Sequence, residues 1–171
     1  MINVLIVDDD PMVAELNRRY LEQVDGFRWQ GSVSTIQAAK QMLLEGDTPI
    51  DLVLLDIKSS DPETYRKVTK QDLAPTLRFA ERLKAMGKPV WVRYVLVPGL
   101  TDAEANVEGV AKLVASMPNV EWVEVLPFHQ LGSFKWKELG LEYQLENTPP
   151  ATPELVERVL GQFRAAGCNA R

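Results

Sequence analysis

The chain has 171 residues, of which 46% are hydrophobic and 25% are charged, and it contains a single cysteine. This length and composition predict one globular domain with a full hydrophobic core. The formal net charge of −5 gives no general attraction to nucleic acid or to an anionic membrane, and one cysteine excludes an internal disulfide. No apolar run is long enough to span a bilayer and no secretory signal is recognisable at the N-terminus, so we expect a cytoplasmic chain that requires no partner.

Buried strands and helices alternate along the chain. The apolar, β-branched run "NVLIV" predicts a strand over 3–7, and Asp10 followed by Pro11 predicts the start of a helix. Further strands are expected at 27–33, 51–57, 89–97 and 120–128. Further helices are expected at 35–44, after Asp61, within "APTLRFAERLKAMGK", after a capping box formed by Thr101 and Glu104, and after Thr152. The segment "GSFKWKELG" favours a helical turn.

Five strands joined by helical crossovers predict an α/β fold with a doubly wound parallel sheet. The usual flavodoxin-like order 2-1-3-4-5 places the ends of strands 1 and 3 side by side, which brings Asp8, Asp9 and Asp56 together. Three converging carboxylates repel one another unless a positive group offsets them. We expect Lys58 or Arg93 to supply most of that charge, with Mg²⁺ binding at the three carboxylates no tighter than about millimolar.

Residues 1–57 resemble the first half of a response-regulator receiver domain, in particular those that respond to citrate and C4-dicarboxylates. The resemblance rests on "VLIVDDDPMVAELNRRYLEQVDGF" and "PIDLVLLDI". It implies that Asp56 is the phosphoacceptor and that Asp8 and Asp9 help to hold Mg²⁺. The second half of a receiver is not present, because Leu126 stands where that family has a lysine and strand 4 does not end in Ser or Thr.

Residues 56–171 resemble the C-terminal part of the pyruvate formate-lyase-activating enzymes, which are radical S-adenosylmethionine proteins with a barrel fold. The matching segments are "LDIKSSDPETYRKVT", "TLRFAERLKAMGKPVWVRYVLVPGLTD" and "NVEWVEVLPFHQLGSFKWKELGLEYQLENTPP". By resemblance, Lys58, Arg93 and His129 lie around the S-adenosylmethionine site together with Asp56. Acidic and basic groups of this kind complement a zwitterionic amino-acid moiety.

The same family holds a [4Fe–4S] cluster with three closely spaced cysteines, whereas this chain has only Cys168, after the last helix. A single thiolate cannot hold such a cluster, so the sequence predicts no iron–sulfur cofactor and no cleavage of S-adenosylmethionine.

These observations lead to the hypothesis of an engineered chimera, a single domain whose residues 1–57 derive from a receiver and whose residues 58–171 derive from a partial TIM barrel. A natural fusion or a degraded gene is the alternative origin. The expected function is that of a scaffold that is not an enzyme. Two alternatives remain: a residual phosphoacceptor with Mg²⁺ at Asp56, or a residual binder of S-adenosylmethionine or another anion through Lys58, Arg93 and His129.

Overall fold

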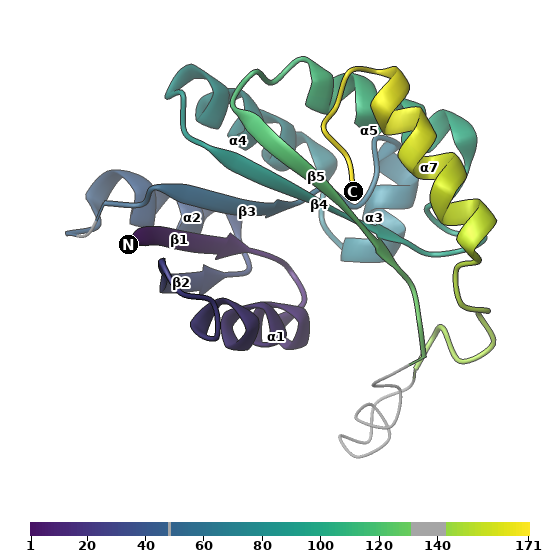
Figure 1. The fold of residues 1–171 in the computed structure, drawn as a ribbon, viewed down its shortest axis with the longest axis horizontal. Coiled ribbons are helices and arrows are strands. Elements are labelled where there is room, and N and C mark those ends of the chain that lie inside the picture. The colour runs from purple at the N-terminus through teal and green to yellow at the C-terminus, as the bar shows by residue number, and fades with distance from the viewer. Residues whose placement is uncertain (48, 131–142) are drawn as a thin grey trace.

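One parallel sheet of five strands, in the order β2-β1-β3-β4-β5, forms the centre of the molecule (Figure 1). The computed structural model describes residues 1–47, 49–130 and 143–171. Its elements are β1 Ile2–Val7, α1 Pro11–Glu22, β2 Phe27–Val33, α2 Ile36–Glu45, β3 Leu52–Asp56, α3 Pro62–Thr69, α4 Leu73–Ala85, β4 Val90–Leu96, α5 Glu104–Ala115, β5 Val120–Pro127 and α7 Pro153–Ala165. The predicted fold class and strand order are therefore confirmed, while the helical turn expected at 132–140 lies outside the described residues.

Three helices begin where the sequence predicts, because each has a polar cap followed by proline. The side chains of Asp10, Asp61 and Thr152 accept hydrogen bonds from backbone N–H groups two or three residues further on. Such caps satisfy the amides that have no partner in the first turn, and the proline that follows lacks an N–H of its own.

The start of α5 differs from the prediction. Its cap position is Ala103, which offers no side-chain hydrogen bond. The Thr101 hydroxyl instead accepts a hydrogen bond from the Val97 N–H at 2.8 Å and donates to the Val95 carbonyl at 2.9 Å. Thr101 thus closes the turn after β4, and the predicted capping box is wrong because this buried turn takes up the hydroxyl.

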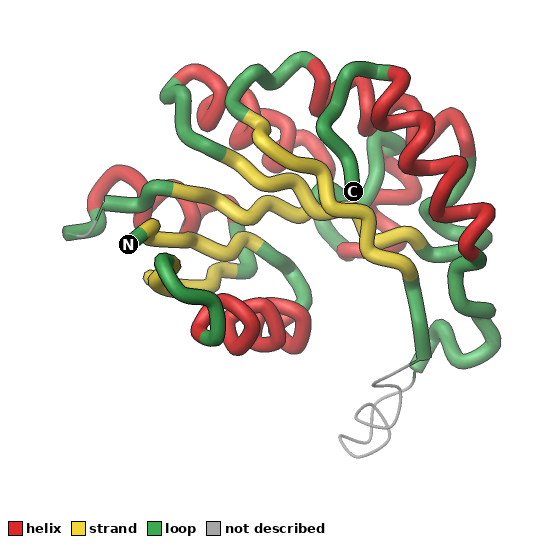
Figure 2. The backbone as a smooth tube through the Cα atoms, in the orientation of Figure 1, coloured by secondary structure: helices red, strands yellow, loops and turns green. Residues whose placement is uncertain are grey.

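Helices cover both faces of the sheet, but unequally. Side chains alternate across a strand, so β1 and β3 each send apolar residues to both sides. On one side α1 packs on the sheet, in a cluster that contains Val4, Ile6, Ala14, Leu21, Leu52 and Leu54. The helices α2, α4, α5 and α7 lie on the other side (Figure 2). They share a larger core. Among the described residues, no helix is both long and apolar enough to cross a membrane.

After α7 the chain turns back and runs along the outer edge of β5. The Val123 N–H donates to the Asn169 carbonyl at 2.9 Å, and the Arg171 N–H donates to the Val123 carbonyl at 3.0 Å. The Arg171 guanidinium lies 4.6 Å from the centre of the Trp122 ring, within cation–π range. The last residues of the chain are therefore bonded to the sheet.

Candidate functional site

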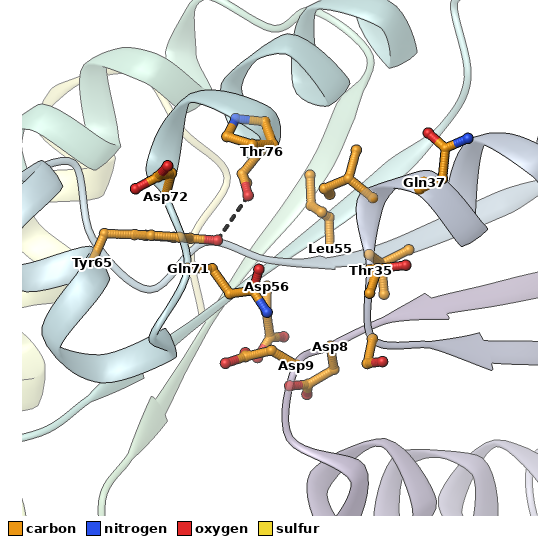
Figure 3. A pocket seen from close by; sticks show the side chains of 14 residues that line it. Asp8, Asp9, Thr35, Gln37, Leu55, Asp56, Tyr65, Gln71, Asp72 and Thr76 are labelled. Carbon is orange, nitrogen blue, oxygen red and sulfur yellow. Dashed lines mark hydrogen bonds between the residues drawn. The ribbon is translucent and has the colours of Figure 1, made fainter.

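The polar residues singled out from the sequence gather where the central strands end. Asp8 directly follows β1, Asp56 is the last residue of β3, and Arg93 is its register partner on β4. Parallel strands end at the same edge of a sheet, and β1 and β3 are neighbours. Figure 3 shows the carboxylates of Asp8, Asp9 and Asp56 close together at that edge, as the predicted strand order requires.

Lys58 reaches into the centre of the three carboxylates. It follows Asp56 by two residues, so the alternation of an extended chain puts both side chains on the same side. Its Nζ lies 2.5 Å from Asp56 Oδ2, 3.5 Å from Asp8 Oδ1 and 3.8 Å from Asp9 Oδ1. The Lys58 side chain is only 13% exposed. This is the neutralisation by a cation from β3 or β4 that the sequence led us to expect.

Arg93 supplies the second cation at longer range. Its Nη1 lies 3.9 Å from Asp56 Oδ1 and 4.0 Å from Asp8 Oδ2, and its Nε lies 3.7 Å from Glu124 Oε2. These separations are too long for hydrogen bonds. Among the described residues, the buried atoms Asp8 Oδ2 and Arg93 Nη1 have no hydrogen-bond partner. Each can therefore take one more polar partner.

Burial and charge shift the pKa values of this group. Burial, and then the charge of Asp56, raises the pKa of Asp8 from 3.8 to about 7, although Lys58 opposes the shift. Burial also raises the pKa of Asp9, again against the charge of Lys58. For Lys58 itself, burial acts to lower the pKa, but the charges of Asp56, Asp8 and Asp9 raise it above its usual value. Lys58 is thus a cation at neutral pH, and Asp8 can change protonation state near neutral pH.

A pocket of about 230 Å³ opens beside the carboxylates. Its far wall comes from α3 and α4, where the Tyr65 hydroxyl and the Thr76 hydroxyl share a hydrogen bond of 2.7 Å (Figure 3). Gln71 and Asp72 also line it. None of these four side chains was predicted. The periodicity of the two helices shows that Tyr65 and Thr76 are buried but not that they meet the end of β1, and Gln71 and Asp72 lie in the exposed turn between the helices.

Two site expectations stay open. Weak Mg²⁺ binding by Asp8, Asp9 and Asp56 stays a prediction, and within the described residues no group of three or more histidine, cysteine or acidic side chains is arranged to hold a metal ion. The Lys58 ammonium already lies among these three carboxylates and would compete with a bound cation. His129 lies beyond the end of β5, is exposed, and does not line the pocket. Phosphate acceptance by Asp56 stays a prediction.

Two solved structures show the same fold at low sequence identity. A domain of pyruvate-formate lyase-activating enzyme from Bacteroides vulgatus superposes with a TM-score of 0.67 and 20% identity, covering 94% of this chain and 88% of that one. The RcsB response regulator of Salmonella typhimurium superposes with a TM-score of 0.55 and 20% identity, covering 97% of this chain and 68% of that one. The arrangement of strands is therefore common to a domain of an activating enzyme and a response regulator.

A curated relative is much closer in sequence. The pyruvate formate-lyase-activating enzyme of Staphylococcus epidermidis is 42% identical over 127 residues, which is 74% of this chain and 51% of that protein. The chain spans about half the length, or less, of the curated relatives that it matches. The aligned stretch is longer than residues 58–171, so the similarity extends to the N-terminal side of Lys58.

The Radical SAM superfamily model matches residues 9–108, which is more than half of the chain. Together with the identity to activating enzymes, this match overturns the expectation of a scaffold that is not an enzyme. It also overturns the expectation of a protein without an iron–sulfur cofactor, because radical SAM proteins use such a cluster together with S-adenosylmethionine. The chain belongs to the radical SAM superfamily.

Proposed function

We propose that this chain forms the S-adenosylmethionine-binding part of an activating enzyme of the pyruvate formate-lyase-activating type. The observation that carries the proposal is the meeting of two cations, Lys58 and Arg93, with three carboxylates at the strand ends. The amino-acid end of S-adenosylmethionine carries a carboxylate and an ammonium group. It therefore needs a cation and a carboxylate at one place, which is the chemistry found there.

The partly satisfied atoms of the site support the same proposal. Asp8 Oδ2 and Arg93 Nη1 are buried and, within the described part of the chain, unpartnered. A zwitterion bound beside them would give the guanidinium a carboxylate and the aspartate an ammonium. Because the Arg93 side chain is only 8% exposed, such pairs would be weakly screened by solvent. His129 stays a proposed third contact on the basis of resemblance alone.

The chain does not itself fit an iron–sulfur cluster. Such clusters are held by several cysteine thiolates, and the sequence supplies only Cys168. Its Sγ lies 3.5 Å from the Ala111 carbonyl, and Cys168 packs against the core under α5 and α7. The proposal therefore assigns to these 171 residues the binding and orientation of S-adenosylmethionine, and derives no step that passes through the cluster.

Isothermal titration calorimetry with S-adenosylmethionine tests the proposal. Lys58→Met should weaken binding by at least about tenfold, because the loss of one charge-assisted contact costs roughly 1.5 to 3 kcal/mol. Lys112→Met is the matched control, since Lys112 is 71% exposed and pairs only with Glu108 among the contacts described. Methylthioadenosine, which lacks the amino-acid moiety, should bind much more weakly than S-adenosylmethionine.

Absence of heat with the wild-type chain would refute the proposal. Equal affinity for S-adenosylmethionine and methylthioadenosine would also contradict it, because the amino-acid moiety would then not be what the site recognises. A loss of affinity in Lys112→Met as large as in Lys58→Met would point to a general charge effect instead.

We also propose that the receiver-like residues 1–57 and residues 58–171 form one domain, a chimera of two fold fragments that meet in β3. The support for this is that β3 pairs with β1 on one side and β4 on the other. Hydrogen exchange tests whether the two segments form one domain. The opening that allows amide exchange should have the same free energy in β1 and in β4. Much faster exchange throughout β1 and β2 would indicate two separate folding units.

A further inference from the structure

A buried amide in the first turn of α5 holds the two loops that leave the site. Asn106 Oδ1 accepts hydrogen bonds from the Ser59 hydroxyl at 2.7 Å and from the Ser60 N–H at 2.9 Å. Its Nδ2 donates to the Thr101 carbonyl at 2.9 Å and to the Tyr94 hydroxyl at 3.2 Å. Asn106 is 7% exposed, so these bonds are shielded from competing water.

These bonds bear on the site because Ser59 and Tyr94 each follow one of its cations. Lys58 stands directly before Ser59, and Arg93 directly before Tyr94. On its other side, Lys58 follows Ile57, whose N–H donates to the Arg93 carbonyl at 3.1 Å. The backbone at Lys58 is therefore fixed at both neighbours, by β4 on one side and by Asn106 on the other.

The same loop rests on a glycine of α5. A Cβ added to Gly109 would lie 2.2 Å from the Ser60 Oγ and 2.8 Å from the Ser60 Cβ, closer than atoms can approach. A glycine inside a helix is unfavourable by itself, so Gly109 is there because of the close approach. Gly161 in α7 provides the contrast, since an added Cβ there meets nothing within 4 Å.

We propose that Asn106 and Gly109 form a positioning clamp that sets the Lys58 ammonium against the carboxylates of Asp8 and Asp56. Neither residue is among those that contact the carboxylates, so they act through Lys58 and are positioning residues. The importance of the clamp for ligand binding rests on the proposed function. The clamp itself can be tested without any ligand.

The test is the rate at which a lysine-reactive acylating reagent modifies Lys58 at fixed pH, measured by peptide mass spectrometry relative to the exposed Lys112. Asn106→Leu removes every side-chain hydrogen bond of Asn106 at similar size, and modification of Lys58 should become at least about fivefold faster. Asn106→Asp keeps the oxygen that accepts from Ser59 and Ser60 but loses the donation to Thr101 and Tyr94, so it should raise the rate at Lys58 less than Asn106→Leu does.

Gly109→Ala disturbs the clamp at its second residue. It should also make modification of Lys58 faster, because the new methyl group displaces Ser60. Gly161→Ala is its matched control and should leave the rate unchanged. A variant that only lowered stability would raise the rate at all buried lysines, whereas the clamp predicts an effect concentrated at Lys58. The half-buried Lys88, which donates to the Ile50 carbonyl, is the internal reference.

An unchanged rate in both Asn106→Leu and Gly109→Ala would overturn the clamp, as would equal increases at Lys58 and Lys88. Should Asn106→Leu fail to fold, the rate of Lys58 modification in Gly109→Ala and in Ser60→Ala decides whether the clamp exists. A chain in which these variants expose Lys58 but which does not bind S-adenosylmethionine would keep the clamp and reject the proposed function.

Discussion

Replacing Asp8 by asparagine should stabilise the protein, and the gain should grow as the pH rises. The Asp8 side chain is fully buried, and its pKa is raised from 3.8 to about 7. A carboxyl group whose pKa is higher in the folded than in the unfolded chain favours folding when protonated. Its stabilising effect is present below about pH 4 and is lost as the pH rises through about 7. Asparagine stays neutral throughout.

The size of the effect follows from the shift. About three pKa units correspond to at most about 4 kcal/mol, at 1.36 kcal/mol per unit. The measured gain should be smaller, because the substitution also removes a partner 3.5 Å from Lys58 Nζ. Urea unfolding near pH 4 and near pH 8 gives the comparison, with equal stabilities expected at the lower pH and a more stable variant at the higher one.

The control is Asp51→Asn. Asp51 is exposed at the opposite end of β3 and accepts hydrogen bonds from the Asn3 backbone and side chain at 2.8 and 2.9 Å. Its replacement should give no gain that increases with pH. The reasoning would be refuted if Asp8→Asn lost stability by the same amount at both pH values, because Asp8 would then be a net stabilising anion for Lys58.

Three further predictions concern α7, each measured by urea unfolding. Thr152→Ala should cost about 1 kcal/mol, because it removes the cap that accepts from the Leu155 N–H; an unchanged midpoint would show that solvent replaces this bond. Phe163→Ala should cost roughly 3 to 5 kcal/mol, because the ring is fully buried and packs edge-on against Tyr94 at 5.5 Å; a loss below about 1 kcal/mol would mean that the core collapses into the cavity. Gly161→Ala should add about 0.5 to 1 kcal/mol, since its Cβ has open space; a destabilised variant would contradict that open space.

The strand order was predictable because local signals were strong and agreed with one another. The run "NVLIV" predicts a strand within β1, and Asp10 with Pro11 starts α1 where expected. Given five alternating units, topology alone then brings Asp8 next to Asp56. The placement of these two residues depends only on where parallel strands end, and a sequence pattern can show this.

The remaining parts of the site depend on contacts between segments far apart in the chain. Asn106 bonds to Ser59 across 47 residues, and no local pattern gives such a pairing. One signal was present, since Asn106 is a polar residue next to Val107 and Val110 on the buried face of α5. A side chain of that kind must find partners inside the protein. The capping box predicted for Thr101 is wrong for a similar reason. The spacing of Thr101 from Glu104 fits a cap, but the Thr101 hydroxyl makes its hydrogen bonds within the turn after β4.

The error about function has a different origin. A single cysteine limits only what these 171 residues can ligate, and it does not show whether the protein is an enzyme. The family match begins at residue 9 and therefore includes most of the segment that resembles a receiver. Receivers and radical SAM proteins both contain a parallel strand that ends in an acidic residue and is followed by a helix. Sequence similarity in this region therefore does not distinguish the two families.

The bonded C-terminus makes the two edges of the sheet unlike each other. Unpaired edge strands are templates on which another chain can add a strand, and they are a common origin of aggregation. Residues Asn169 to Arg171 occupy part of that position on β5, whereas among the described residues β2 pairs only with β1. Without the bonds made by Asn169 and Arg171, β5 would therefore become a second site for intermolecular strand addition.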